Sequence, residues 1–288
     1  MTTRRHFLQL ASGTAVAALF PARAADPAPG AELAVMTYNL RYGSVSGPEA
    51  WSRRRPLIGQ VFQQYAPDVL GTQEGLYWQL KDLAADQGAY DWIGHGRDGG
   101  SRGEFMAVYF RRERLEPMEY EHFWLSDTPE VIGSSTWGNT NRRMVTWVRF
   151  KDRRTGREFH FWNTHLDHAL QPAREKGAEL ILKRLGRVPA ALPVLLVGDF
   201  NAEARNNPAY DLLTGGGLTD TWYAAGERRQ EDANSFNGFQ PLRREGRRID
   251  WILGRGLASV RAAEVVTLQP GGQFPSDHCP VAAWLTLA

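Results

Sequence analysis

Residues 193–203 read PVLLVGDFNAE, and this stretch constrains the fold more than any other part of the chain. Pro193 to Val197 form a short apolar run bounded by Pro and Gly, which is typical of a β-strand buried on both faces. Asp199 and Asn201 follow, two residues apart. Side chains two residues apart on an extended backbone point to the same side, so we expect a carboxylate and an amide side by side where the strand leaves the core.

The same arrangement recurs where other apolar runs end. A single polar residue near a strand end is usually a helix cap or a turn residue. A series of such ends is different, because core strands gain nothing in packing from ending on carboxylates and imidazoles. The sequence therefore predicts that these ends supply functional residues, namely Asn39, Arg41, Glu74, His165, Asp167, His168, Asp199, Asn201, Asp250, Asp277 and His278.

These residue types suit a narrow range of chemistry. Carboxylate and amide oxygens prefer Mg²⁺, Mn²⁺ or Ca²⁺ to zinc. An Asp beside an Asn can orient a water molecule and donate to a developing oxyanion. A His with a carboxylate partner, here His278 with Asp250, can stabilise charge or move a proton. Together they are the parts of a metal-assisted phosphoester hydrolase.

Motifs of other enzyme classes are absent or incomplete. The chain has no H-E-x-x-H or G-x-x-x-x-G-K-[ST] sequence, and GGSRG at 99–103, which fits the spacing G-x-S-x-G, lies in a Gly-rich turn before a β-like run. GHGRDG at 94–99 does fit the spacing G-x-G-x-x-G. A second Gly-rich turn and a β-like run follow it instead of the helix that a dinucleotide site requires, so we interpret it as a β-turn.

Apolar periodicity predicts alternating strands and helices. Strands are expected over 33–39, 67–73 and 193–198, with helices over 52–64, 76–87 and 172–187. Several consecutive β-like runs in the middle indicate antiparallel pairing and therefore mixed sheets. No Pro/Ser/Gly-rich linker divides the chain, which favours one domain. Residues 226–247 show no periodicity, and long runs of that kind are usually functional or mobile.

The N-terminus resembles an export signal. Arg4 and Arg5 precede an apolar run over 7–20 and an Ala22-Arg23-Ala24 site, the layout of a bacterial twin-arginine (Tat) leader. That run is shorter than the ~20 residues needed to span a bilayer. We expect a Tat-type signal peptide over 1–24, a short remnant over 25–32, a domain over 33–288, and a protein in the periplasm or outside the cell.

Removal of the leader changes the charge of the chain. Its three arginines account for the excess of bases, and 31 basic residues against 32 acidic ones remain. Net charge then gives no support to a nucleic-acid footprint.

Six segments resemble the endonuclease/exonuclease/phosphatase superfamily in order and spacing: TYNLR, TQE, NTHLD, GDFNAE, RRIDWIL and SDHCPV. That superfamily includes DNase I, abasic-site endonucleases, neutral sphingomyelinases, inositol polyphosphate 5-phosphatases and deadenylases. The resemblance runs from about Leu33 to the C-terminus and is similar to a secreted bacterial branch. It implies an α/β four-layer sandwich, with two mixed β-sheets packed face to face, helices outside, and an active site at one edge. We also expect a monomer.

The resemblance implies a metal site for Mg²⁺ or Mn²⁺. Glu74 matches the position of the chief metal ligand, and Asn39 and Asp277 match neighbouring positions.

The resemblance also implies catalytic roles. Asp199 would align or deprotonate the attacking water, and Asn201 would contact the scissile phosphate. His278, oriented by Asp250, would stabilise the pentacovalent transition state. His165 would bind phosphate or protonate the leaving oxygen.

Substrate recognition is left open by these motifs. The Tyr that nucleases of the superfamily place near the phosphate has no clear counterpart, so we expect Arg143 to supply a phosphate contact. Arg248 closes a basic run that could reach a polyanion, and Phe236 and Phe239 could stack on bases, contact a lipid or anchor their loop.

The expected partner is a phosphoester, whether nucleic acid, nucleotide or phospholipid head group, besides the Tat export machinery. A sphingomyelinase-like lipid phosphodiesterase is one alternative, although no exposed apolar hairpin is evident. A non-catalytic binding protein on the same fold is the other, and it is disfavoured because every expected position is filled.

Overall fold

The computed structural model describes residues 31–288, so the expected signal peptide and most of its remnant lie outside the described residues. Two mixed sheets form the centre. The seven-stranded sheet has the order β10-β12-β13-β1-β2-β4-β3, and the six-stranded sheet has the order β5-β6-β7-β8-β11-β9. The pairs β1–β2, β7–β8 and β10–β12 are parallel, whereas the other neighbours are antiparallel.

The strands of the first sheet are β1 (Leu33–Asn39), β2 (Val69–Leu76), β3 (Tyr90–Ile93), β4 (Glu104–Arg111), β10 (Glu227–Arg229), β12 (Leu257–Val265) and β13 (Val281–Leu287). Those of the second are β5 (Leu115–Trp124), β6 (Met144–Asp152), β7 (Glu158–His165), β8 (Val194–Asp199), β9 (Thr219–Asp220) and β11 (Asp250–Arg255). The helices are α1 (Trp51–Tyr65), α2 (Tyr77–Asp86), α3 (Gln171–Leu185), α4 (Pro208–Gly215), the short α5 (Thr221–Ala224) and the 3₁₀ turn η1 (Pro270–Gly272).

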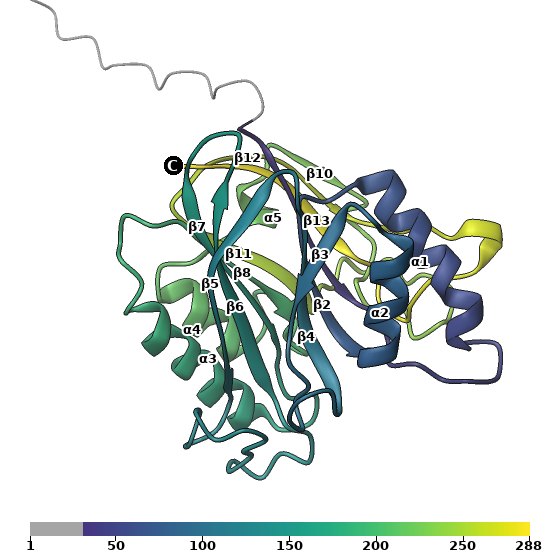
Figure 1. Ribbon diagram of the computed structural model, residues 1–288, viewed down its shortest axis with the longest axis horizontal. Coiled ribbons are helices and arrows are strands. Elements are labelled where there is room, and N and C mark those ends of the chain that lie inside the picture. The colour runs from purple at the N-terminus through teal and green to yellow at the C-terminus, as the bar shows by residue number, and fades with distance from the viewer. Residues whose placement is uncertain (1–30) are drawn as a thin grey trace, which may run out of the picture.

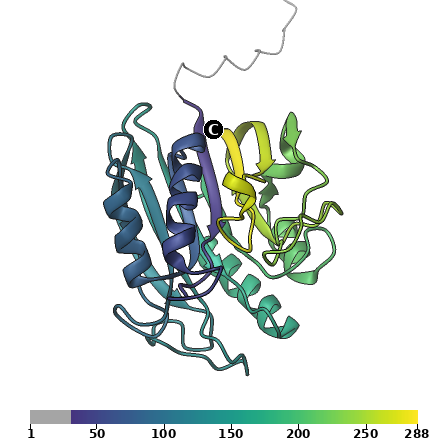
Figure 2. The ribbon, with the colours of Figure 1, turned by 90° about the vertical axis from the view of Figure 1, so that its right-hand side faces the viewer.

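Helices cover the outer faces of both sheets, as Figures 1 and 2 show, with α1 and α2 on one side and α3 and α4 on the other. Three apolar cores hold the layers together. Val35, Val197 and Leu285 belong to the core between the sheets. Ile58 lies in the core under α1 and α2, and Ile181 in the core under α3 and α4. The expected four-layer α/β sandwich is confirmed.

Helix positions agree with the periodicity to within two residues at each end. The predicted helices 52–64, 76–87 and 172–187 correspond to α1, α2 and α3. Residues 226–247, which lack periodicity, contribute only the three-residue strand β10. The rest of that segment is held by side-chain and backbone hydrogen bonds instead of by regular structure.

The two sheets approach closely near their functional edge. A Cβ on Gly71 would lie 2.5 Å from the Val197 side chain, so only glycine fits there. Beside it, the Gln73 amide donates to Asn163 Oδ1 at 2.7 Å, linking β2 to β7. Asn163 in turn donates to the Thr72 carbonyl at 2.8 Å. These buried contacts fix the register between the sheets where the site forms, because an unpaired amide there would cost free energy.

Among residues 31–288, no helix combines the length and the apolar character needed to cross a membrane.

Candidate active site

Three strands deliver polar side chains to the same edge of the sandwich. Asn39, His165 and Asp199 are the last residues of β1, β7 and β8. Asp250 opens β11 and pairs in register with Asp199. The loop before β13 adds Asp277 and His278. The result is a cavity of about 330 Å³ lined by Arg41, Tyr42, Glu74, Arg97, Glu104, Asn141, Arg143, His165, His168, Asp199, Asn201, Phe236, Asp277 and His278.

Close packing explains why Gly198 precedes the central carboxylate. A Cβ at that position would lie 2.2 Å from the Thr164 carbonyl oxygen. Glycine therefore lets β7 and β8 run together up to their last residues, His165 and Asp199, which are paired in register.

His278 and Asp250 form the buried pair that the sequence analysis expected. The imidazole Nδ1 lies 3.0 Å from Asp250 Oδ2 and 3.2 Å from Oδ1. Burial lowers the pKa of His278, but the carboxylates of Asp250 and Asp199 outweigh burial and raise it to about 10. The ring is thus a cation at neutral pH and can stabilise negative charge.

Asp199 is fully buried and surrounded by donors. Its Oδ2 accepts from Asn39 Nδ2 at 2.9 Å, and its Oδ1 accepts from the Asn201 backbone N–H at 2.9 Å. Burial raises the pKa of Asp199 to about 7, with the His278 cation opposing part of that shift. A carboxylate with a pKa near neutral is suited to accept a proton from water.

Asn201 reaches the site in a different way from the one predicted. Its φ of 48° is left-handed, so strand alternation does not place it beside Asp199. The hydrogen bond from its backbone to Asp199 makes a tight turn at the strand end instead. Its amide then lies 2.9 Å from His165 Nε2 and donates to the Leu166 carbonyl at 3.1 Å.

His165 differs electrostatically from His278. Burial, followed by repulsion from the positive charge of Arg143, holds the pKa of His165 well below its usual value. Its Nε2 faces Asn201 and lies 3.3 Å from Asp199 Oδ2. The ring is therefore neutral, which suits a hydrogen-bonding role better than donation of a proton to a leaving group.

Glu74 and Asp277 also line the cavity, and together with Arg41 they are called the Glu74 wall. Arg41 lies between them, with Nη1 4.0 Å from Glu74 Oε2 and Nε 3.6 Å from Asp277 Oδ2. Glu74 sits at a bulge of β2 with a φ of 63°, an uncommon conformation that costs roughly 1–3 kcal/mol and is found at functional sites. Asn39 Nδ2 donates to Glu74 Oε1 at 3.0 Å, which joins this wall to Asp199.

Two sets of side chains are candidate ligands of a cation. Atoms of Asp199, Asp250 and His278 lie within 4.8 Å of one another, close enough to hold an ion. However, His278 Nδ1 already lies within hydrogen-bond distance of Asp250, and all three residues are buried. Glu74 and Asp277 share a cation, Arg41, and line the open cavity. We therefore favour Glu74 and Asp277 over the buried group as the ligands of a cation.

Arg143 lines the cavity and is only 4% exposed. Its Nη2 lies 3.1 Å from His168 Nδ1, and its Nε lies 3.7 Å from Asp167 Oδ2 without a hydrogen bond. Burial and the neighbouring Arg97 lower the pKa of Arg143. A buried guanidinium without a closely paired carboxylate is suited to bind an anion.

Arg97 and Asn141 are site residues that the sequence reasoning missed. Arg97 belongs to the GHGRDG segment, which forms turns as predicted and is followed by β4 instead of a helix. Its Nη1 pairs with Glu104 at 2.7 Å, and its Nη2 donates to Asn141 at 3.4 Å. Burial raises the pKa of Glu104 to about 7. The one sequence feature that could have identified Arg97 as a site residue is its place in a glycine-rich turn after a strand.

Arg248 does not belong to the cavity, which corrects the expectation that it binds substrate. It is 2% exposed, its Nη2 donates to Asp220 at 3.0 Å, and its guanidinium stacks over Trp222 at 4.7 Å. A side chain enclosed in this way stabilises the fold and cannot reach a ligand. The residues beside it, Arg243, Arg244 and Arg247, are exposed.

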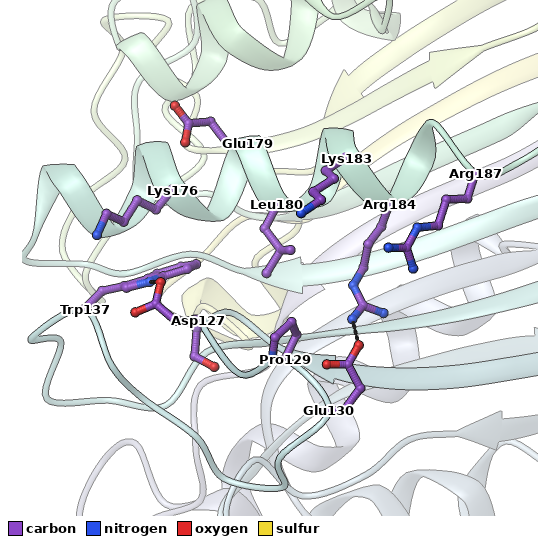
Figure 3. Close-up of a pocket in the computed structure, with 11 residues that line it drawn as sticks. Asp127, Pro129, Glu130, Trp137, Lys176, Glu179, Leu180, Lys183, Arg184 and Arg187 are labelled. Atoms are coloured by element: carbon purple, nitrogen blue, oxygen red, sulfur yellow. Dashed lines mark hydrogen bonds and ion pairs between the residues drawn. The ribbon is translucent and has the colours of Figure 1, made fainter.

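A larger cavity, of about 510 Å³, lies between α3 and the loop after β5 (Figure 3). Lys176, Lys183 and Arg184 on α3 face Asp127 and Glu130 across it, and Arg184 pairs with Glu130. It contains neither a histidine nor a buried carboxylate pair, so its size alone does not make it the active site.

The fold and the site together define a phosphoester hydrolase of the DNase I-like class. A family model described as "Endonuclease/Exonuclease/phosphatase family" matches residues 36–278. The chain belongs to this family. No match was found among curated proteins.

Solved structures agree with this assignment. A family protein from Bacteroides thetaiotaomicron is 35% identical, with a TM-score of 0.81 over 89% of this chain and 98% of that one. A mannosyl-6-phosphatase from the same organism is 34% identical, with a TM-score of 0.81 over 88% and 100%. The human Nocturnin catalytic domain, 19% identical with a TM-score of 0.69 over 89% and 95%, shows the shared fold alone.

Proposed function

We propose that this protein is a divalent-metal-dependent hydrolase of phosphomonoesters, with a sugar phosphate as substrate. One observation supports this most strongly: the Asp199 carboxylate, the His278 cation and the under-compensated Arg143 guanidinium line a single cavity. A base for water, a positive charge for the transition state and an anion-binding group are the elements that phosphoryl hydrolysis needs.

Each residue has a role that follows from its surroundings. Asp199, held by hydrogen bonds from Asn39 and Asn201, orients the attacking water and accepts its proton. The protonated His278, held by Asp250, stabilises the charge that grows on the phosphoryl oxygens. His165 keeps the Asn201 amide in place through its Nε2 atom.

We propose Mg²⁺ or Mn²⁺ as the cofactor, with Glu74 as the chief ligand and Asn39 and Asp277 nearby. The fit rests on two carboxylates that share the Arg41 cation and line the cavity. Oxygen ligands of this kind suit hard cations. When bound, the ion supplies positive charge for the phosphoryl group.

A phosphomonoester suits the cationic side of the cavity. A monoester carries up to two negative charges at neutral pH, and Arg97, Arg143 and His278 all line the space where a phosphate fits. The similar mannosyl-6-phosphatase, 34% identical, supports a sugar as the organic part.

The lipid alternative has one observation in its favour. Val131 and Ile132 are adjacent and more than half exposed, at 55% and 60%, in the loop between β5 and β6. Two side chains are small beside the apolar patches of a few hundred Å² that mark membrane contacts. We therefore rank a sphingomyelinase-like lipid phosphodiesterase below a sugar phosphatase, and a binding protein without catalysis below both.

Turnover of matched substrates tests the proposal. The purified protein is assayed with mannose 6-phosphate, p-nitrophenyl phosphate, bis-p-nitrophenyl phosphate and sphingomyelin, with Mg²⁺, Mn²⁺ or EDTA. We expect metal-dependent release of phosphate from the two monoesters. Asp199→Ala should abolish it and leave the thermal transition largely intact. Preference for a diester would contradict the monoester proposal, and inactivity on all four with metal bound would contradict the substrate class.

We propose further that the protein is exported by the Tat pathway. The support is the Arg4-Arg5 leader, which lies outside the described residues. Replacing both arginines by lysine should retain the protein in the cytoplasm of a Tat-competent host, as judged by cell fractionation. Unchanged export would contradict this.

A further inference from the structure

A second cavity, of about 290 Å³, adjoins the active site. Phe236 lines both, so the two spaces share this residue as part of their walls. The second cavity belongs to the segment between β10 and β11, and its walls are Asn234, Phe236, Asn237, Gly238, Gln240, Arg243, Glu245, Arg247 and Ile249.

Phe236 contacts the catalytic histidine and also lines this second cavity. Its ring centroid lies 5.0 Å from that of His278 in an edge-to-face arrangement, and its backbone forms a β-bridge with His278. The side chain is nevertheless 46% exposed. An exposed aromatic face fixed this close to the catalytic group can contact whatever is attached to a bound phosphate.

The walls of the second cavity are fixed although they lack regular structure. Asn234 Oδ1 accepts from the backbone N–H groups of Glu245 at 3.1 Å and Arg247 at 3.0 Å, which ties the two sides of the loop together. The backbone N–H groups of Asn237 and Gly238 donate to the Asp277 carbonyl at 2.8 and 3.0 Å. The loop is therefore anchored to the active site, and its cavity is preformed.

Two polar side chains in this cavity have no partner within residues 31–288. The Gln240 amide and the Arg243 guanidinium are exposed, and neither makes a side-chain hydrogen bond or ion pair with these residues. Arg247 differs, because it lies 3.2 Å from Glu245. The cavity thus offers free donors and an amide oxygen beside two apolar surfaces, Phe236 and Ile249.

We propose that this second cavity binds a sugar unit of the substrate, next to the unit that carries the phosphate. A pyranose has an apolar face that can pack on Phe236 and hydroxyl groups that pair with Gln240 and Arg243. A nucleobase would gain less, because only one aromatic ring lines the cavity. This inference rests on the proposed sugar phosphatase activity, and it makes the protein an enzyme for phosphorylated oligosaccharides.

Kinetics with a short and a long substrate test the inference. The probes are mannose 6-phosphate and a mannobiose that carries one 6-phosphate, compared by the ratio of their kcat/KM values. We expect the disaccharide to be preferred, and Arg243→Ala to lower that preference about tenfold, as loss of a hydrogen bond to a charged group does. The matched control is Arg244→Ala, because Arg244 pairs with Asp232 at 2.8 Å and does not line the cavity. It should leave the ratio unchanged.

Each outcome decides between the two proposals. No preference for the disaccharide, an equal effect of both substitutions, or a greater gain from a nucleoside monophosphate than from the disaccharide would overturn the sugar subsite while the phosphatase proposal stands. If neither sugar phosphate is hydrolysed, the proposed function fails. Calorimetry with the phosphorylated mannobiose then decides the subsite, which requires binding that Arg243→Ala weakens and Arg244→Ala does not.

Discussion

His278 Nδ1 lies 3.0 Å from Asp250 Oδ2, and both side chains are buried. The other ring nitrogen, Nε2, lies 3.6 Å from Asp199 Oδ2. One imidazole therefore lies between two carboxylates on adjacent antiparallel strands, β11 and β8, which are in register at Asp250 and Asp199. This arrangement keeps the histidine positively charged in a place where burial alone would discharge it.

Asp250→Asn should lower kcat by roughly 100-fold or more, the usual range for loss of a positioned acid–base group. The substitution removes the negative charge that holds the proton on His278 while preserving the shape of the side chain. Steady-state turnover of p-nitrophenyl phosphate measures it, with Asp211→Asn on the exposed surface of α4 as control. Equal kcat values for the two variants would show that the His278–Asp250 pair does not support catalysis.

The same pair should make stability depend on pH. The pKa of His278 is raised from 6.5 to about 10 in the folded state, so its stabilising contribution is complete below about pH 6.5 and is lost as the pH rises through 10. In EDTA, Tm should fall between about pH 7.5 and 9, a window chosen above the pKa of about 7 for Asp199. Asp250→Asn should flatten this slope. If Tm of Asp250→Asn falls with pH as steeply as that of the parent protein, Asp250 does not raise the pKa of His278.

Arg143→Lys should raise KM for a phosphomonoester by about 10- to 100-fold, because lysine keeps the charge but loses the planar set of donors. Arg142→Lys is the matched control. Arg142 is the neighbouring residue and forms an ion pair with Asp98 at 2.9 Å on the surface. Initial rates over a range of substrate concentrations measure both variants. A similar KM in both would remove Arg143 from phosphate binding.

Glu74→Gln should abolish the rise in Tm that Mg²⁺ produces in the parent protein, because the ligand charge is lost while the side chain keeps its size. Thermal shift with and without Mg²⁺ measures the effect independently of activity. Asp250→Asn provides the comparison. If it loses the Mg²⁺ response and Glu74→Gln keeps it, the ion binds at Asp199, Asp250 and His278 instead.

Arg248→Met should destabilise the fold by ~3–5 kcal/mol, the usual result of leaving a buried charge without its partner. Here the charge left behind is that of Asp220, which lies 3.0 Å from Arg248 in the parent protein. Denaturant titration measures the loss, and adding Asp220→Asn to Arg248→Met should restore part of it. KM for the substrate should stay the same as in the parent protein. A raised KM with unchanged stability would return Arg248 to the binding site.

Local sequence was enough to predict which polar residues end strands and where the main helices lie. Asn39, His165 and Asp199 do end their strands, and α1 to α3 lie where periodicity places them, because burial of one face fixes the spacing of apolar residues. Asn201 was assigned to the right neighbourhood for the wrong reason, since its left-handed backbone is set by the turn it makes with Asp199.

The sequence by itself determined the alternation of strands and helices and the polar residues at the strand ends, because both depend on short-range spacing along the chain. The family and the layered sandwich followed from the resemblance of six segments to a known superfamily. Only the tertiary structure decided which charges are compensated. Arg143 and Arg248 look alike in the sequence. Arg143 lines the cavity, with Asp167 Oδ2 3.7 Å from its Nε, whereas Arg248 is enclosed and pairs with Asp220 at 3.0 Å. A side chain's partners come from distant parts of the chain, and burial rather than spacing sets the strength of their interaction.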